Sequence, residues 1–352
     1  MKNNQTVLAL LSALCVLVLM AEFARSQEKA AAGTVQVHLV ITDAGLQADA
    51  ELPRLQKTDD VKVKQGRNFL NVTQLIPAQG DNVALQLMIL IDDVLDTGVG
   101  NNLQDIKAFI SAQPSTTIIG VAYMSNATVN VVQNFTADHD LAVKAVRLPR
   151  GNLSSMDSPY LSLISLVKGW QQQNVRREVL MVTDGIDRLR GETPQRSGTL
   201  SNSRTGSRSR SGIDSRLGPD FGPVYHSMPT ISVDTTSASE ISQRYNVLVH
   251  SIYAPGVGRA GRSSWDVQLG ISGLTKLADE TGGECFSLGT SQLVSFKPYL
   301  DRFQKMLDNQ YYVVFQAVPG NKAGLQRINV QTELKNSEIL APDNAWVAAA
   351  GK

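Results

Sequence analysis

The sequence predicts an α/β protein: a doubly wound, mostly parallel sheet with helices on both faces, plus a small β-sandwich-like region built from the N- and C-terminal segments. Between residues 83 and 309, continuous apolar runs alternate with segments of helical periodicity, a pattern typical of strands buried on both faces. Residues 27–82 and 310–352 instead carry short β-branched runs separated by Gly, Pro and Asn. The 352 residues, 42% of them hydrophobic, can bury a substantial core.

The first 26 residues have the pattern of an export signal. Lys2 precedes an apolar run over residues 7–21, and small residues flank a plausible cleavage point near Ser26. The run is shorter than the roughly 20 residues that a spanning helix needs. We therefore expect a cleaved signal peptide and a secreted or periplasmic mature chain without a membrane span. Retention as an N-terminal anchor is the alternative.

The strands of the N-terminal region are expected in three runs, each rich in β-branched residues and followed by a turn signal. These runs are "TVQVHLVITDAG", "DDVKVKQG" and "NFLNVTQLIPA". The C-terminal region repeats the pattern in "QYYVVFQAVPG", "LQRINVQTEL" and "AWVAAA". Neither end has enough strands for a confident sheet domain alone, so we expect the two ends to pair with each other.

The central region opens with the continuous apolar strand "LQLMILI" and the helix "NLQDIKAFISAQ", whose Leu103, Ile106, Phe109 and Ile110 recur at helical spacing. Strands and helices then follow in "STTIIGVAYM", "TVNVVQNF", "DHDLAVKAV", "SPYLSLISLVKGW" and "REVLMVT". The last four expected elements are "SASEISQRY", "NVLVHSIYA", "GISGLTKLADETGG" and "SFKPYLDRFQKML". Such alternation indicates a parallel sheet with crossover helices.

Residues 191–236 interrupt this alternation with a Ser-, Arg- and Gly-rich insertion. Its centre, "RSGTLSNSRTGSRSRSGIDSR", is nearly free of apolar residues and cannot offset the entropy of ordering, so we expect a flexible segment. Its arginines could alternatively bind an anionic polymer. Over the whole chain 33 basic residues balance 32 acidic ones, which disfavours nucleic acid as a partner and means that a partner must be recognised locally.

Three polar segments are expected at the carboxyl edge of the sheet, where open α/β sheets bind ligands. Asp92, Val94 and Asp96 follow the first strand as alternate residues. Ser158 introduces a helix in "MDSPYLSL". Thr183, Asp184 and Gly185 follow the buried strand "VLMVT". Because these strands are expected to be parallel, their ends should meet.

Together these segments resemble the von Willebrand factor A (VWA) domain, in which a D-x-S-x-S motif, a Thr from a second loop and an Asp from a third loop hold a divalent cation. The resemblance covers residues 83–309, and "VLMVTDG" is its best local match. A closer resemblance is to the VWFA-related proteins of Acidobacteria. It rests on the edge motif "LTKLADETGGECF" and on the flanking pieces "VKVKQGRNFLNVTQL", "YYVVFQAVPG" and "RINVQTEL".

The resemblance implies a site for Mg²⁺ or another divalent cation formed by Asp92, Asp96, Ser158 and Asp184. Ser158 stands where the family has Thr, and Val94 and Asp96 stand at the two serine positions. Valine has no oxygen to offer, whereas Asp96 offers a carboxylate in place of a hydroxyl. Since Mg²⁺ accepts water at vacant positions, the loss of one hydroxyl ligand need not abolish binding. The resemblance therefore implies a degenerate metal site.

Acidic residues gathered at one edge need a counter-charge. Two carboxylates about 4 Å apart repel by roughly 4 kcal/mol at an effective dielectric of 20, so a cation, a proton or an arginine is expected beside them. Arg188 and Arg150 are available in the sequence. The alternative is that these residues only cap helices and end strands, since Ser158 followed by Pro159 is itself a helix-start signal.

Enzyme motifs do not stand out in the sequence: G-x-S-x-G, H-E-x-x-H and G-x-x-x-x-G-K-[ST] are absent from the 352 residues. We therefore expect a non-enzymatic, adhesion-type protein whose carboxyl-edge loops bind a protein or a surface polymer. Asp93, Thr97 and Tyr160 are predicted to contact that partner. The alternatives are a structural scaffold module of the cell envelope with no functional metal site and, more distantly, a hydrolase acting at the acidic cluster.

Overall fold

The computed structural model describes residues 35–44, 54–80, 83–171, 175–190, 232–257, 264–287 and 294–349. The expected signal peptide and residues 191–231 of the expected insertion lie outside the described residues.

A six-stranded sheet forms the centre of the molecule, in the order β10-β9-β8-β5-β6-β7. Its strands are β5 (Leu85–Asp92), β6 (Thr117–Ser125), β7 (Thr128–Thr136), β8 (Arg176–Thr183), β9 (Leu248–Tyr253) and β10 (Cys285–Phe286). All neighbouring pairs are parallel except β6 and β7, which form an antiparallel edge. Every residue of β5 and β8 is buried, which explains why residues 87–91 of β5 are continuously apolar rather than alternating.

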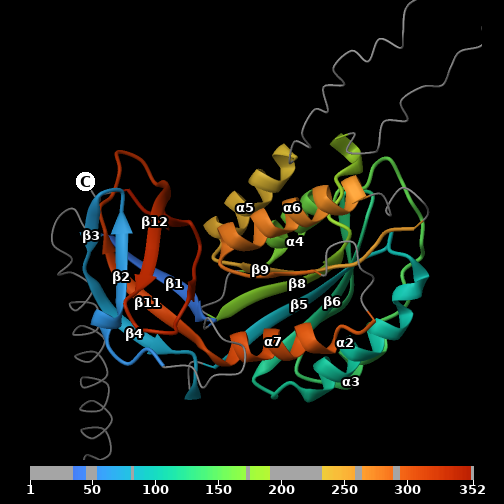
Figure 1. Cartoon of the computed structure of the whole chain (residues 1–352), viewed down its shortest axis with the longest axis horizontal. Helices are drawn as coiled ribbons and strands as arrows, with labels where there is room; N and C mark the ends of the chain where they lie inside the picture. Colours follow the sequence, from blue (N-terminus) through green and yellow to red (C-terminus); the bar gives the residue numbers. More distant parts are fainter. Residues whose placement is uncertain are drawn as a thin grey trace, which may run out of the picture.

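Helices cover both faces of this sheet (Figure 1). One face carries α2 (Gly100–Ala112), α3 (His139–Ala145) and α7 (Lys297–Asp308), and the other carries α4 (Pro159–Gly169), α5 (Val233–Arg244) and α6 (Ser264–Thr281). Each layer has its own apolar core: Ile89, Ile106 and Phe303 belong to the first, and Leu90 and Leu163 to the second. The predicted doubly wound, VWA-like α/β fold is therefore confirmed.

The two ends of the chain combine into two further four-stranded sheets, β13-β1-β11-β4 and β14-β12-β2-β3. Their strands are β1 (Val35–Asp43), β2 (Val61–Gln65), β3 (Asn68–Leu70), β4 (Val72–Pro77), β11 (Gln310–Ala317), β12 (Gly324–Thr332), β13 (Ile339–Leu340) and β14 (Asn344–Val347). β1 pairs antiparallel with β11 over its length, and the sheets share a core that includes Ile41, Val63 and Phe315. The expectation of a sandwich-like region built from both ends is confirmed.

Two helices begin earlier than the sequence predicted. α5 begins at Val233, inside the segment expected to belong to the insertion, because the Ser232 hydroxyl caps it by accepting the N–H of Asp234. α6 begins at Ser264, six residues before the expected segment "GISGLTKLADETGG". Both extensions lengthen the helical layer that covers the sheet.

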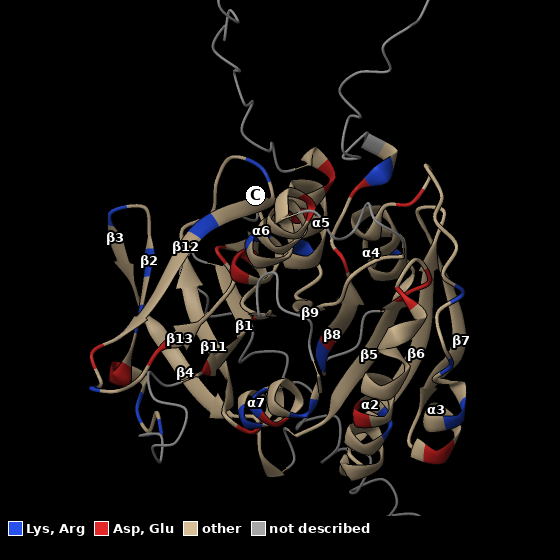
Figure 2. Cartoon of the chain, turned by 45° about the vertical axis from the view of Figure 1, so that its right-hand side comes forward, with Lys and Arg blue, Asp and Glu red and all other residues tan. Residues whose placement is uncertain are grey.

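Charged residues of both signs are spread over the described part of the chain (Figure 2). Lys and Arg positions are interspersed with Asp and Glu positions over the described elements (Figure 2). Among the helices that the structure describes, none is both long and apolar enough to cross a membrane.

The register of the sheet brings three strand ends to one edge. Ile91 pairs with Val182, and Thr183 pairs with Tyr253, so β5, β8 and β9 end side by side. The segments that leave these strands include the short helices η3 (Thr97–Val99) and η4 (Arg188–Arg190). This carboxyl edge is where the sequence places its polar residues.

Candidate functional site

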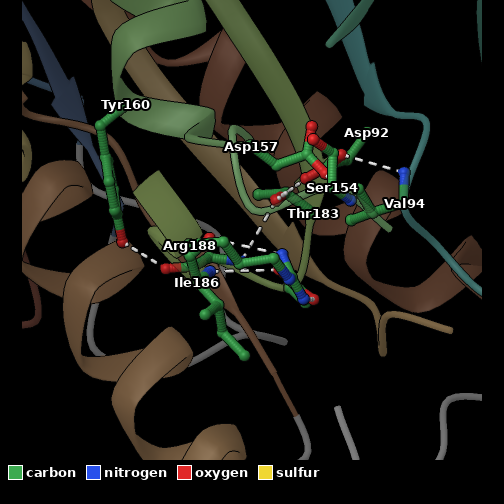
Figure 3. Close-up of polar contacts among 10 residues, drawn as sticks. Asp92, Val94, Ser154, Asp157, Tyr160, Thr183, Ile186 and Arg188 are labelled. Atoms are coloured by element: carbon green, nitrogen blue, oxygen red, sulfur yellow. Dashed lines mark hydrogen bonds and ion pairs between the residues drawn. The ribbon is translucent and has the colours of Figure 1, made fainter. Parts of the chain in front are cut away.

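Asp92, the last residue of β5, is buried at the carboxyl edge and is held by two donors (Figure 3). The Thr183 hydroxyl donates to Asp92 Oδ2 at 2.6 Å, and the backbone N–H of Val94 donates to Oδ1 at 3.2 Å. Burial, followed by the charge of Asp184, raises the pKa of Asp92 to about 7. The protonated and ionised forms of this carboxyl are therefore close in free energy near neutral pH.

Asp184, just beyond β8, forms a buried ion pair with Arg188. Arg188 Nη2 donates to Asp184 Oδ2, and Nη1 lies 3.3 Å from Oδ1, so the guanidinium engages both oxygens. The N–H of Ile186 also donates to Oδ1 at 3.1 Å. Burial alone lowers the pKa of Arg188, but Asp184, Asp92 and Asp157 raise that pKa overall above its usual value. Arg188 is therefore charged.

Asp157 and Ser158, at the start of α4, use their side chains to fix backbone. Asp157 accepts the N–H of Asn126 and the N–H of Ser154, both at 2.7 Å. Ser158 Oγ accepts the N–H of Leu161 at 3.3 Å and so caps α4. At Ser158, the capping role that the sequence offered as the alternative is what the structure shows.

Asp96 caps η3, with Oδ1 accepting the N–H of Gly98 at 2.8 Å. It lines a hollow of about 270 Å³ together with Asn102, Pro255 and Phe296. Asp96 thus lines this hollow while its carboxylate caps η3.

The segment after β9 lies on Asp184, one of the three buried carboxylates (Asp92, Asp157 and Asp184) that we call the acidic cluster. Gly256 forms a β-bridge with Leu95, and the N–H of Val257 donates to the carbonyl of Val94 at 2.9 Å. A Cβ atom at Gly256 would lie 2.3 Å from Asp184 Oδ2, so only glycine allows this approach. The cover explains why Asp92 and Asp184 have almost no exposed surface.

As arranged, these side chains do not fit the divalent cation that the resemblance implies. Every carboxylate oxygen of Asp92, Asp157 and Asp184 already accepts a hydrogen bond from the protein. Val94 supplies no oxygen, and Ser158 Oγ serves as a cap. Within the described residues, no group of three or more His, Cys, Asp and Glu side chains is placed to hold a metal ion.

Two of the three residues predicted to contact a partner, Asp93 and Tyr160, have buried side chains. Asp93 forms a bidentate pair with Arg147, at 2.7 and 2.9 Å. The Tyr160 hydroxyl donates to the carbonyl of Gly185 at 2.8 Å. Of the three, only Thr97 is exposed. Neither Asp93 nor Tyr160 has the free surface that direct contact with a partner requires.

The two arginines expected as counter-charges lie beside different carboxylates. Arg188 lies against Asp184, as the sequence allowed, but Arg150 lies near Asp93, where its backbone N–H donates to Oδ1 at 3.2 Å. Arg147 is the main partner of Asp93 and was not anticipated. Its guanidinium also lies 3.7 Å from the centre of the Tyr123 ring.

Comparison with known proteins adds a likeness of fold. No family profile matches the chain, and no curated protein sequence matches it. A von Willebrand factor type A structure from Catenulispora acidiphila is 10% identical to this chain. The match covers 91% of this chain and 75% of the Catenulispora chain, with a TM-score of 0.38. An aerotolerance-related membrane protein from Bacteroides fragilis shares 10% identity over 64% of this chain and 99% of its own, at a TM-score of 0.40.

A third similar structure is the pilus adhesin RrgA from Streptococcus pneumoniae, with 8% identity, 92% coverage of this chain, 65% coverage of its own and a TM-score of 0.36. The VWA-like fold stands on the strand order, the antiparallel edge strand and the two helical layers.

Proposed function

We propose that this chain is a non-enzymatic binding protein whose carboxyl-edge loops contact a partner protein directly, without a bridging metal ion. The observation that supports this most is that three apolar side chains are exposed on the segment 147–157, which lies between α3 and α4. Leu148, Leu153 and Met156 expose 54%, 47% and 54% of their surface there. Apolar side chains grouped on one exposed loop are typical of protein interaction sites.

The loop that carries these side chains is anchored at several points. The N–H of Gly151 donates to the carbonyl of Asp93 at 2.9 Å, and Arg147 and Asp157 fix its two ends through the contacts described above. An anchored loop loses less conformational entropy on association than a free one. Burying its apolar side chains would contribute about 25 cal/mol for each Å² removed from water.

Exposed polar residues accompany these apolar side chains, and polar residues are also part of many protein interfaces. Arg150, whose side chain is 63% exposed, lies on the same loop, and Thr97 is exposed on η3. These residues would give specificity to a contact whose stability comes from Leu148, Leu153 and Met156. The proposal keeps the carboxyl edge as the binding face but replaces Asp93 and Tyr160 by the exposed loop.

A hydrolase is supported less well, because a substrate would have to reach Asp92 or Asp184, and both are buried beneath the segment around Gly256. We further propose that the chain is exported, on the strength of its N-terminal 26 residues. The closer relation to the VWFA-related proteins of Acidobacteria also remains a proposal, based on "LTKLADETGGECF".

Site-specific photo-crosslinking in the producing cell tests the binding face. A photoreactive amino acid at Met156 is expected to capture a defined partner band. The same amino acid at Leu141, which is 44% exposed on α3, serves as the matched control and is expected to capture none. Equal capture at both positions, or none at either, would refute the proposed face and favour a scaffold role. Mass spectrometry then identifies the partner, and N-terminal sequencing of exported protein tests cleavage near Ser26.

A further inference from the structure

We propose that Arg188 takes the place of the divalent cation in this VWA-like edge, so that the chain supplies its own positive charge to the acidic cluster. This inference rests on the buried cluster alone and does not depend on the partner-binding loop. The presence of Arg188 would then be the reason why these side chains do not suit a metal ion.

The cluster requires a positive charge. Asp92, Asp157 and Asp184 are all buried, and buried carboxylates repel one another and have lost hydration, a cost that a nearby cation offsets. Arg188 is buried with them, and its charge interacts favourably with all three. A single guanidinium thus supplies the attraction that a metal ion would otherwise supply.

The contact geometry suits arginine in particular. Nη1 and Nη2 engage the two oxygens of Asp184, and Nη1 also lies 3.4 Å from the carbonyl of Ile186. A planar guanidinium presents its donors as a fork that matches a carboxylate, whereas a lysine amine is a single point charge. The spacing of four residues between Asp184 and Arg188 lets one short turn of chain form the whole contact.

The covering segment leaves no path for a metal-bridged partner. A Cβ atom built at Gly256 would lie 2.3 Å from Asp184 Oδ2 and 3.2 Å from Arg188 Nη2, so this segment lies directly on the ion pair. A bound Mg²⁺ keeps several waters or exchanges them for ligands from a partner, which requires access to solvent. The closed cluster gives neither, so binding at this edge should not depend on divalent ions.

Thermal unfolding of the full chain, with and without metal, tests the inference. Arg188→Ala is compared with wild type and with Arg150→Ala, a control that removes an exposed arginine 3.9 Å from Asp93. Wild type and the control should have the same Tm in EDTA as in millimolar MnCl₂. Arg188→Ala should lower Tm by about 10 °C in EDTA, because it leaves buried carboxylates without their counter-charge. Removing the guanidinium vacates its place between Asp184 Oδ2 and the Gly256 segment, so MnCl₂ should raise the Tm of this variant.

A rise in the wild-type Tm with MnCl₂, or no response to MnCl₂ in Arg188→Ala, would overturn the inference. Arg188→Lys separates charge from geometry: its Tm should fall below that of wild type, since an amine lacks the two parallel donor groups that the guanidinium directs at the oxygens of Asp184. A Tm equal to that of wild type would show that the planar guanidinium has no advantage over an amine at this position. If Arg188→Ala does not fold in EDTA, its refolding yield with and without MnCl₂ is the readout. A higher yield with MnCl₂ supports the inference, and equal yields overturn it.

Discussion

Replacing Gly270 by alanine tests how tightly α6 packs against the acidic cluster. A Cβ atom built at Gly270 would lie 1.9 Å from the backbone oxygen of Asp184, far inside van der Waals contact. The atom that it meets belongs to backbone, and the Asp184 side chain is fixed by Arg188 and Ile186. Neither side can relax by a rotamer change, so α6 must move away from the sheet.

The magnitude follows from two opposing effects. Overpacking typically costs about 1–3 kcal/mol, and a clash with backbone belongs at the upper end or above. Alanine recovers up to about 1 kcal/mol of helix propensity relative to glycine. We therefore expect Gly270→Ala to lower the free energy of unfolding by roughly 2–3 kcal/mol.

Urea unfolding of wild type, Gly270→Ala and Gly169→Ala measures this difference. Gly169, the last residue of α4, has no atom within 4 Å of a built Cβ. Gly169→Ala should therefore be neutral or stabilising by up to about 1 kcal/mol. A Gly270→Ala protein within about 0.5 kcal/mol of wild type, a size usual for surface changes, would refute the proposed close packing. Equal destabilisation by both variants would refute it too.

Three further predictions concern the polar contacts. Arg147→Ala should lower the free energy of unfolding by about 1–3 kcal/mol, because it leaves the buried Asp93 without its main partner, although the side chain removed is itself one-third exposed. Urea unfolding of the variant and of wild type measures this difference. An unchanged free energy of unfolding would contradict a stabilising role for the ion pair. Thr183→Val, nearly isosteric, should cost about 1–3 kcal/mol by removing the hydroxyl that donates to Asp92, and an unchanged urea midpoint would speak against that bond. Because the pKa of folded Asp92 is raised from 3.8 to about 7, its contribution to stability is present in full at acidic pH and is lost as pH rises to and through 7. Asp92→Asn should therefore flatten the decline of stability between about pH 4 and pH 7, and an unchanged pH profile would show that Asp92 is not its source.

The fold, the position of Asp92 and the pairing of Asp184 with Arg188 could be predicted from the sequence, because all three depend on local pattern. Residues 87–91 of β5 form a continuous apolar run. Because the run ends in a polar residue, the sequence predicts that Asp92 lies at the carboxyl edge. Arg188 was an expected counter-charge because it lies only four residues from Asp184. Strand ends and short-range pairs are therefore within reach of sequence reasoning.

The contacts that close the site were not predictable in the same way. Asp93 meets Arg147 across 54 residues, and Tyr160 meets Gly185 across 25. Nothing in the local pattern marks these polar side chains as buried, so they were expected to face a partner. Gly256 covers Asp184 through a loop that follows another strand, a long-range contact that only the assembled fold supplies. Asp157 directly precedes the capping Ser158, and its contacts with Asn126 and Ser154 are likewise supplied by the folded chain.

Direct measurement of Mn²⁺ binding to the wild-type chain is the sharpest test of Arg188 as the internal cation. Titration followed by electron paramagnetic resonance distinguishes free Mn²⁺ from bound Mn²⁺. We predict that the free signal grows in proportion to added Mn²⁺, with no saturable site, because Arg188 already neutralises Asp184 and the carboxylate oxygens are engaged. Saturable binding of one Mn²⁺ per chain, displaced by Mg²⁺ and lost in Asp184→Ala, would contradict it.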